Sequence, residues 1–419
     1  MYPAVVAISS YRHLADIRCR AIRFIASAGM RILMISDVYF PRINGVSTSI
    51  QTFRRGLHAA GHETVLIAPQ YPAGDAGQEG RIIRVPSRYL PRDPEDRIMK
   101  AGELRALRPE LRKSGFDLVH IQTPFLAHYH GVSIARQLGV PVIETYHTYF
   151  EEYLHHYVPL IPRSVMRFVA RRFTVSQCSA LDALVVPSKA MQTALEDYGV
   201  RCPMHIIPTG MEMDRFASGS GKGFRERLGI APDRPTLVHV GRIAHEKNID
   251  FLLRMFVKVV KRRPETMFVI AGEGPALEHC KSYVESLQLS ASVRFVGYLS
   301  RDRELPDCYS AGDLFVFSSK TETQGLVLLE AMACGTPVVS TAYMGTADIV
   351  KPERGARVAP DNEAGFADLV IDLLNDPARR RTMSTEARDY AATWSAGAMA
   401  KRMADLYRDI TTKDVKAAA

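Results

Sequence analysis

Short apolar runs alternate with longer amphipathic segments along most of the chain. This alternation is typical of parallel β-sheets that carry helices on both faces. The expected strands form two series, the first at 31–36, 63–68, 81–86, 117–122, 141–146, 183–187 and 204–208, and the second at 236–240, 267–271, 293–297, 313–318 and 337–341. Helix patterns such as 47–60 and 249–261 lie between them. The sequence therefore predicts an α/β protein with two doubly wound domains.

The length of 419 residues is enough for two to three domains at roughly 150 residues per domain. A turn-rich segment at 208–216, followed by a Gly- and Ser-rich stretch, marks the expected boundary. We therefore expect an N-terminal domain at 30–208, a C-terminal domain at 209–395, a last helix at 396–410 that returns to the first domain, and a polar tail at 411–419.

Residues 1–29 precede the first expected strand, which follows Met30. Their short apolar piece at 5–8 comes before four arginines, the reverse of the order in a secretory signal. Our hypothesis is that 1–29 form a poorly ordered extension, upstream of the natural start.

The composition, 47% hydrophobic and 24% charged, is that of an ordinary globular protein and excludes disorder. The six cysteines contain no C-x-x-C pair, so neither a zinc knuckle nor a dithiol site is indicated, and reduced thiols in a cytoplasm are expected. No apolar run approaches the roughly 20 residues that span a bilayer, which argues against an integral membrane protein.

The net charge of +9 belongs to the first half of the chain, where residues 1–210 contain 25 basic and 17 acidic side chains. Part of it is a stripe at helical spacing with apolar residues between its members, which are Arg163, Arg167, Arg171 and Arg172. Such a helix suits an anionic membrane surface, and a solvated helix face is the alternative. Nucleic acid is disfavoured because no aromatic residues interleave with the basic ones as a stacking platform.

The most informative segment, 318–337, is predicted as a loop and a helix between two strands. Ligands of open parallel sheets bind at the carboxyl ends of strands, which is where this loop lies. The amides of Gln324, Gly325 and Leu326 would be unpaired donors at the helix start. Glu322 in the loop and Glu330 in the helix can each accept two hydroxyl hydrogen bonds. Glu330 lies in an apolar helix, where a charge needs a partner.

A second loop, 241–248, follows another strand and brings Arg242 and Lys247 to a helix start. Cations clustered at the positive end of a helix dipole favour an anionic ligand such as a diphosphate, and a surface ion pair to Glu246 is the alternative. Gly272 and Gly274 form a G-x-G after the next strand, without the rest of a dinucleotide fingerprint.

In the first half, Gly45 lies in a turn before a helix, where it would let the backbone approach a ligand closely. His147 follows the strand at 141–146, and its position at a strand end makes it a site candidate. His155 and His156 are adjacent and lack a carboxylate at metal spacing, so they do not predict a metal site.

Together these segments resemble glycosyltransferase family 4, retaining enzymes of the GT-B fold with two Rossmann-like domains facing a central cleft, over about residues 30–410. The resemblance implies that Arg242 and Lys247 hold the donor diphosphate, that Glu330 holds the ribose and that Glu322 and the amides from Thr323 onward hold the donor sugar. It also places His147 near the transferred sugar and Gly45 beside the diphosphate. It implies a nucleotide-sugar co-substrate, no metal, and proton transfer from the acceptor to the leaving phosphate.

The segment 145–157 further resembles bacterial diacylglycerol glucosyltransferases and implies an acceptor region that includes Tyr149, Glu152, Tyr153 and His156. We therefore expect a cytoplasmic enzyme, peripheral at the inner face of the membrane. It would move glucose from UDP-glucose to a lipid or glycolipid acceptor such as diacylglycerol. GDP-mannose as donor and a sugar-nucleotide epimerase on the same fold are the alternatives.

Overall fold

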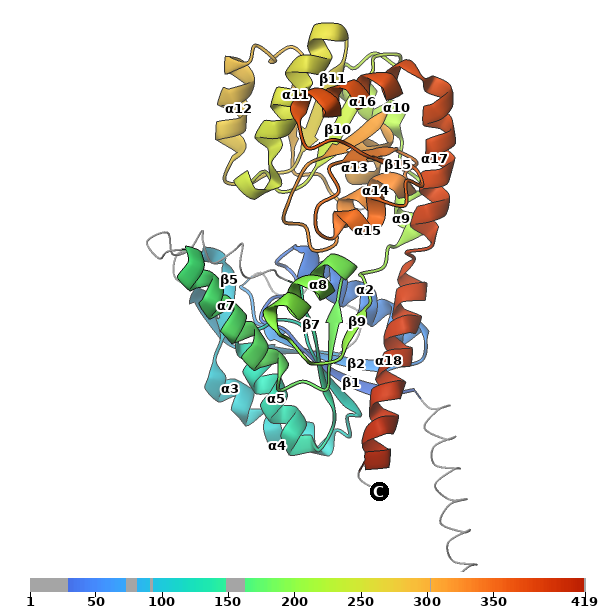
Figure 1. Ribbon diagram of the computed structural model, residues 1–419. Coiled ribbons are helices and arrows are strands. Elements are labelled where there is room, and N and C mark those ends of the chain that lie inside the picture. Colours follow the sequence, from blue (N-terminus) through green and yellow to red (C-terminus); the bar gives the residue numbers. More distant parts are fainter. Residues whose placement is uncertain (1–28, 73–80, 91–92, 148–162, 302, 418–419) are drawn as a thin grey trace, which may run out of the picture.

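The computed structural model describes residues 29–72, 81–90, 93–147, 163–301 and 303–417. Two α/β domains are stacked on each other, and α17 (Pro377–Ala392) and α18 (Ala396–Ala417) run along one side of both (Figure 1). This architecture confirms the predicted fold class.

The N-terminal sheet has seven parallel strands in the order β3-β2-β1-β6-β7-β8-β9. Each corresponds to an expected strand: β1 (Arg31–Ile35), β2 (Glu63–Pro69), β3 (Arg81–Val85), β6 (Leu118–Ile121), β7 (Val142–Thr145), β8 (Ala183–Val186) and β9 (Met204–Ile206). Its helices are α2 (Gly45–Ala59), α3 (Ala101–Ala106), α4 (Arg108–Lys113), α5 (Leu126–Leu138), α7 (Arg163–Cys178) and α8 (Lys189–Tyr198). Helix α2 begins two residues before its expected start, because the Asn44 side chain accepts from the amide of Ser47 at 2.8 Å and caps it there.

An antiparallel pair, β4 (Ser87–Leu90) and β5 (Asp93–Met99), was not predicted. The sequence of β5 begins Asp-Pro-Glu-Asp and has neither an apolar run nor strict alternation. The pair stands outside the main sheet, so it does not change the predicted fold class.

The C-terminal sheet has six parallel strands in the order β12-β11-β10-β13-β14-β15. They are β10 (Thr236–Val240), β11 (Met267–Ala271), β12 (Val293–Gly297), β13 (Leu314–Phe317), β14 (Val338–Ser340) and β15 (Ala356–Val358). The surrounding helices are α9 (Met213–Phe216), α10 (Gly221–Leu228), the 3₁₀ turn η1 (His245–Lys247), α11 (Ile249–Arg262), α12 (Leu277–Ser286), α13 (Glu304–Ser310), α14 (Leu326–Ala333), α15 (Thr346–Val350) and α16 (Glu363–Asn375). Strand β15 was missed, because three residues are too few to show a period.

Side chains of each central strand divide between two apolar cores, one on each face of the sheet. In β1, Leu33 and Ile35 belong to one core, while Ile32 and Met34 belong to the other. Burial on both faces explains why the strands read as continuous apolar runs rather than as alternating ones.

The chain crosses between the domains twice, and the two crossings bond to each other. The amide of Met211 donates to the carbonyl of Trp394 at 2.8 Å, and the amide of Ala396 donates back to the carbonyl of Met211 at 2.8 Å. After the second crossing, α18 packs on α2, where a Cβ on Gly56 would lie 2.4 Å from the Cβ of Ala400.

The prediction of a polar tail after the last helix was wrong for residues 411–417, because α18 continues to Ala417. The hydroxyl of Thr411 donates to the carbonyl of Tyr407, and that of Thr412 donates to the carbonyl of Arg408, so these threonines bond within the helix. No glycine or proline follows Thr411 to end it. None of the helices in the described part of the chain combines the length and the apolar character that crossing a bilayer requires.

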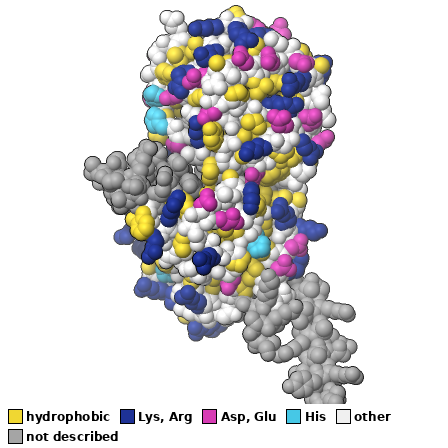
Figure 2. Space-filling view, in the orientation of Figure 1, with side chains coloured by type: hydrophobic (Ala, Val, Ile, Leu, Met, Phe, Trp, Pro, Cys, Tyr) yellow, Lys and Arg dark blue, Asp and Glu magenta, His cyan; other side chains and the backbone are white. Residues whose placement is uncertain are grey.

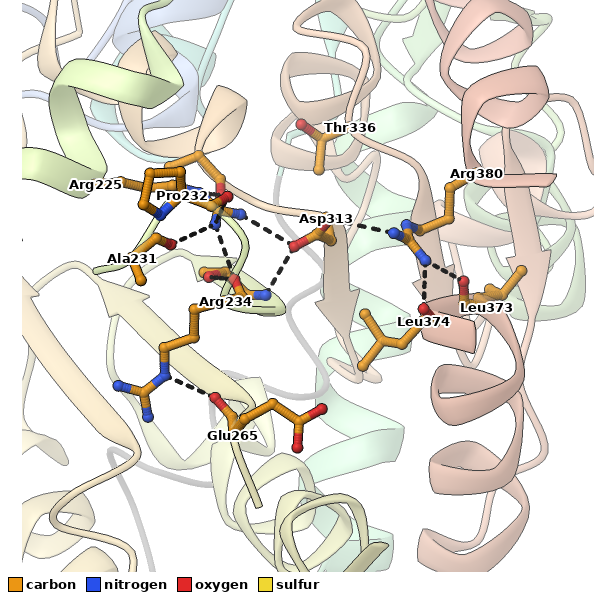
Figure 3. Close-up of polar contacts among 12 residues, drawn as sticks. Arg225, Ala231, Pro232, Arg234, Glu265, Asp313, Thr336, Leu373, Leu374 and Arg380 are labelled. Carbon is orange, nitrogen blue, oxygen red and sulfur yellow. Dashed lines mark hydrogen bonds and ion pairs between the residues drawn. The ribbon is translucent and has the colours of Figure 1, made fainter. Parts of the chain in front are cut away.

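A saturated ion-pair cluster lies at the amino ends of the C-terminal sheet (Figure 3). Asp313, just before β13, pairs with Arg225 at 3.0 Å and with Arg380 at 3.5 Å, and it accepts from the amide of Thr236 at 2.9 Å. The two guanidinium groups also donate to the backbone carbonyls of Ala231, Pro232, Arg234, Leu373 and Leu374. We name this group the Asp313 cluster.

Candidate active site

The loop between β13 and α14 is held in one conformation by close backbone contacts. Gly325 precedes the helix with φ +89°, a left-handed conformation that favours glycine. Gly345 donates its amide to the carbonyl of Glu322 at 2.8 Å, and a Cβ on Gly345 would lie 2.0 Å from the carbonyl oxygen of Thr323. These contacts hold the backbone of the loop that carries Glu322, Thr323, Gln324 and Gly325.

Lys247 and Glu322 meet at the carboxyl ends of β10 and β13. The ammonium of Lys247 lies 2.5 Å from Oε1 of Glu322, and the two side chains are 19% and 21% exposed. The hydroxyl of Ser318 donates to the carbonyl of Asn248 at 3.0 Å, and this bond ties the two loops together. The described carboxylate that pairs with Lys247 is thus Glu322, rather than the Glu246 of the alternative interpretation.

Arg242 lies on the same side, in a loop that the two predicted glycines brace. The Arg242 side chain is exposed and makes no ion pair with any residue of the described ranges. A Cβ on Gly272 would lie 1.9 Å from the carbonyl oxygen of Gly241, and a Cβ on Gly274 would lie 2.3 Å from that of Ile243. A side chain at either position would collide with the backbone of the loop that carries Arg242. Both glycines therefore allow that loop to pack closely.

Glu330 is 4% exposed, and both of its oxygens have partners. The hydroxyl of Tyr309 donates to Oε2 at 2.7 Å, and the Arg301 guanidinium pairs with Oε1. Glu330 raises the pKa of Arg301, and burial together with Glu330 raises that of Tyr309. The expectation that this charge needs a partner is confirmed, although the sequence did not indicate either partner.

Gln324 joins the loop between β13 and α14 to the crossing between the domains. Its Oε1 accepts from the amide of Thr209 at 2.8 Å, and its Nε2 donates to the carbonyl of the same residue at 2.8 Å. Thr209 in turn donates to the hydroxyl of Ser49 in α2 at 2.7 Å. Further along, the amide of Lys189 in α8 donates to the carboxylate of Asp348 in α15 at 2.6 Å. The loops at the carboxyl ends of both sheets therefore face each other.

His147 lies two residues beyond β7, on the N-terminal side of this meeting point. Its Nε2 lies 3.2 Å from Oε1 of Gln122, a residue that the sequence analysis did not single out. Burial lowers the pKa of His147 to about 4, so the imidazole is neutral at pH 7. The structure does not bring His147 into contact with Glu322 or Lys247, because they belong to opposite domains.

Gly45 and Asp37 follow the first strand on the same edge. Gly45 begins α2, and a Cβ there would meet no atom within 4 Å, so packing alone does not require glycine. Asp37 accepts from the hydroxyl of Thr123 at 2.8 Å and from the amide of Ala127 at 3.1 Å. Burial raises the pKa of Asp37 to about 6. Asp37 thus fixes the start of α5.

The predicted acceptor region is described only in part. Tyr149, Glu152, Tyr153 and His156 lie outside the described residues. Helix α7 contains Arg163 and Arg167, whose side chains also lie outside the described part.

The described half of α7 contains two arginines of the stripe, Arg171 and Arg172. The guanidinium carbon of Arg171 lies 4.9 Å from the centre of the Tyr198 ring, so this arginine packs against the domain. Arg172, Phe168 and Val169 are exposed, the latter two at 64% and 55%. Of these two arginines, Arg172 faces the solvent, whereas Arg171 packs on Tyr198.

Within the described ranges, no group of three or more His, Cys, Asp or Glu side chains is placed to hold a metal ion. The site contains one loop with two cations, Arg242 and Lys247, together with two carboxylates and a neutral histidine. This set can bind phosphate and several hydroxyl groups at once.

Comparisons with known proteins agree with this arrangement. Residues 43–215 match the model "Glycosyltransferase Family 4", and residues 222–390 match "Glycosyl transferases group 1". The α-monoglucosyldiacylglycerol synthase of Streptococcus pneumoniae is 32% identical over 389 residues, 91% of this chain and 86% of the relative. A GDP-mannose-dependent α-mannosyltransferase of Mycobacterium tuberculosis is 28% identical over 84% of this chain and 90% of the relative.

Among solved structures, Anabaena HepE in complex with UDP and glucose aligns with a TM-score of 0.72 at 17% identity, covering 90% of this chain and 99% of that one. Two facing Rossmann-like domains, the C-terminal one with a cation-bearing loop at the carboxyl ends of its strands, define a glycosyltransferase of the GT-B class. More particularly, the chain belongs to glycosyltransferase family 4.

Proposed function

We propose that the chain is a retaining hexosyltransferase that moves glucose from UDP-glucose to a lipid acceptor such as diacylglycerol. The observation that carries the proposal is the Lys247–Glu322 pair, fixed beside Arg242 at the carboxyl ends of β10 and β13. The name of the pneumococcal relative supports glucose and a diacylglycerol-type acceptor. Both family models describe transferases, which disfavours the epimerase alternative.

In the proposed reaction, the bond from the anomeric carbon to the diphosphate oxygen breaks. The acceptor oxygen forms its bond to the same carbon on the same face, through an oxocarbenium-like state. The acceptor proton passes to the leaving phosphate. Negative charge grows on that phosphate, so Arg242 and Lys247 stabilise the transition state more than the ground state.

The two glutamates have separate tasks in this proposal. Glu330 holds the ribose hydroxyls, because each of its oxygens has a second acceptor site beside the bonds from Arg301 and Tyr309. Glu322 and the amides after it hold hydroxyl groups of the donor sugar. Lys247 then lies between this sugar and the diphosphate, since it already contacts Glu322.

No metal is part of the proposal, because Arg242 and Lys247 supply the positive charge that a divalent cation would otherwise bring to the diphosphate. Activity in the presence of a chelator is the direct test.

We further propose that the N-terminal domain lies on an anionic membrane at the cytoplasmic face. Figure 2 shows Lys and Arg gathered at the lower left of this domain, whereas both signs interleave over the upper, C-terminal domain. Exposed Phe168 and Val169 beside Arg172 give α7 the apolar and basic groups that interfacial helices use. Cations of α3 and α4 add to the same domain, including Arg105, Arg112 and Lys113.

Product analysis with a panel of UDP- and GDP-sugars against mixed lipids tests the proposal. The expected result is a glucosylated lipid formed from UDP-glucose. A mannosylated product from GDP-mannose would establish the second candidate, which the mycobacterial relative supports. Transfer to a soluble sugar alone would overturn the lipid acceptor and leave the family assignment in place.

A further inference from the structure

Gln122 follows β6 directly, and His147 follows the neighbouring strand β7. The two strands are parallel, with Ile121 opposite Glu144, so their carboxyl ends lie side by side. Gln122 is 3% exposed, and its amide donates to the carbonyl of Ile35 at 2.9 Å, which anchors its backbone. Its side-chain Oε1 lies 3.2 Å from Nε2 of His147.

This contact decides which nitrogen of His147 carries the proton. A neutral imidazole has one N–H and one bare nitrogen. A carbonyl oxygen only accepts, so the nitrogen that faces Oε1 of Gln122 must be the one with the hydrogen. The other nitrogen, Nδ1, then keeps its lone pair and is the acceptor of the ring.

His120, the other histidine near His147, has no free nitrogen to bond the His147 ring. His120 is 1% exposed, and both of its nitrogens are engaged, Nδ1 with the Tyr407 hydroxyl at 2.7 Å and Nε2 with the Thr145 hydroxyl at 2.7 Å. Burial, with His147 as a smaller cause, lowers the pKa of His120 to about 3. In the described part of the chain, Gln122 is thus the side chain that bonds the His147 ring.

We propose that Gln122 is a positioning residue that holds His147 with its hydrogen on Nε2, so that Nδ1 accepts a hydrogen bond from a hydroxyl of the transferred sugar. The inference rests on the proposed function and on the family resemblance, which implies that His147 lies near the transferred sugar. It adds Gln122 to the site and makes Nδ1 of His147 the acceptor of the hydrogen bond from the sugar. It also requires a neutral amide at position 122, because that amide keeps the hydrogen on Nε2.

The test compares Gln122→Met, Gln122→Glu and His147→Ala by kcat, donor KM and pH profile. Gln122→Met keeps the length but removes the acceptor, and kcat should fall roughly five- to tenfold with little change in KM, the factor that one ordinary hydrogen bond supports. Gln122→Glu puts a carboxylate next to Nε2, which favours the charged imidazolium and raises the pKa of His147. The loss of activity on the acid side of its pH profile should therefore begin at a higher pH than in the wild type.

Gln177→Glu is the matched control, because Gln177 is also a buried glutamine of this domain and donates to the carbonyl of Pro124 at 2.6 Å instead. It should change stability without shifting the acid side of the pH profile. Nitrogen-15 spectra of histidine-labelled wild type, with His147→Ala used for assignment, measure the tautomer directly even if a Gln122 variant does not fold.

Each outcome bears on a different claim. A hydrogen on Nδ1 in the wild type, or Gln122→Glu with the pH profile of the wild type, overturns the role of Gln122. A fully active His147→Ala enzyme instead overturns the role of His147 in the proposed function. An impaired His147→Ala enzyme together with an unimpaired Gln122→Met enzyme removes the Gln122 inference alone.

Discussion

Two charged groups lie at opposite ends of the same C-terminal sheet, and they differ in how completely their charges are satisfied. In the Asp313 cluster, the carboxylate has two arginine partners and a backbone amide, and both guanidinium groups also bond to backbone carbonyls (Figure 3). At the carboxyl ends, Lys247 contacts Glu322, while exposed Arg242 has no ion pair within the described ranges.

The difference separates stability from function. The charges of the Asp313 cluster are paired with each other and with the backbone, so this cluster is expected to hold α10, β13 and α17 together. Cations gathered where helix amides and a strand end already favour anions are expected to hold a ligand. If this contrast holds, changes at the Asp313 cluster should affect stability, and changes at the carboxyl ends of the strands should affect activity.

The largest effect is expected for Asp313→Ala. It would leave Arg225 and Arg380, only 13% and 18% exposed, without their carboxylate. The free energy of unfolding should fall by about 3 kcal/mol, since breaking a largely buried pair costs about that much. Urea unfolding measures it. Donor affinity per folded molecule should stay unchanged, and a specific loss of donor binding would show that the two ends of the sheet are not separable.

Arg242→Ala and Lys247→Ala should do the reverse. Each should lower kcat/KM at least tenfold, which corresponds to about 1.4 kcal/mol of lost transition-state stabilisation, with no comparable loss of stability. Steady-state kinetics and thermal unfolding provide the two readouts. Lys258→Ala, an exposed change on α11, is the control for surface charge. Near-normal rates in both variants would remove the diphosphate assignment.

Neighbouring arginines of α7 repeat the contrast on a smaller scale. Arg172→Gln should weaken binding to anionic vesicles by roughly fivefold, because a cation near such a surface contributes about 1 kcal/mol. Arg171→Gln should change vesicle binding less, since Arg171 packs on Tyr198. Co-sedimentation with vesicles measures both, and binding should weaken as salt rises. Wild-type protein that ignores anionic vesicles at low salt would contradict the membrane proposal.

The smallest effect is expected from chelation. Transfer should proceed unchanged in EDTA, because Arg242 and Lys247 provide the positive charge at the diphosphate in this account. Initial rates with and without chelator are the measurement. Activity that is lost in EDTA and restored by magnesium or manganese would show that these side chains are insufficient.

The sequence predicted the main fold because strands buried on both faces, such as β1 and β10, appear as apolar runs in any context. It missed β5, whose residues are mostly polar, and the last turns of α18, where threonines bond to the helix backbone. Neither feature has a strong hydrophobic period.

The sequence indicated some residues of the site and missed others, depending on whether their role is visible within one stretch of the chain. Glu322, Arg242 and Lys247 stand out because charged residues at strand ends are visible in one stretch of sequence. Gln122 and Arg301 were missed because their roles depend on which strands and helices are neighbours. Gln122 reaches His147 only because β6 pairs with β7, and Arg301 reaches Glu330 only because the loop after β12 lies beside α14. Gln122 could have been found by examining the polar residue that ends each predicted strand, because ligands of parallel sheets bind at those ends.

The most direct test of the central claim is product analysis of UDP-glucose incubated with dispersed diacylglycerol, for the wild type and for Lys247→Ala. UDP and a lipid-linked glucose should appear in equal amounts, the anomeric configuration of the donor should be retained, and Lys247→Ala should lower both products together. Release of UDP with no transferred sugar, or a product of inverted configuration, would contradict the central claim.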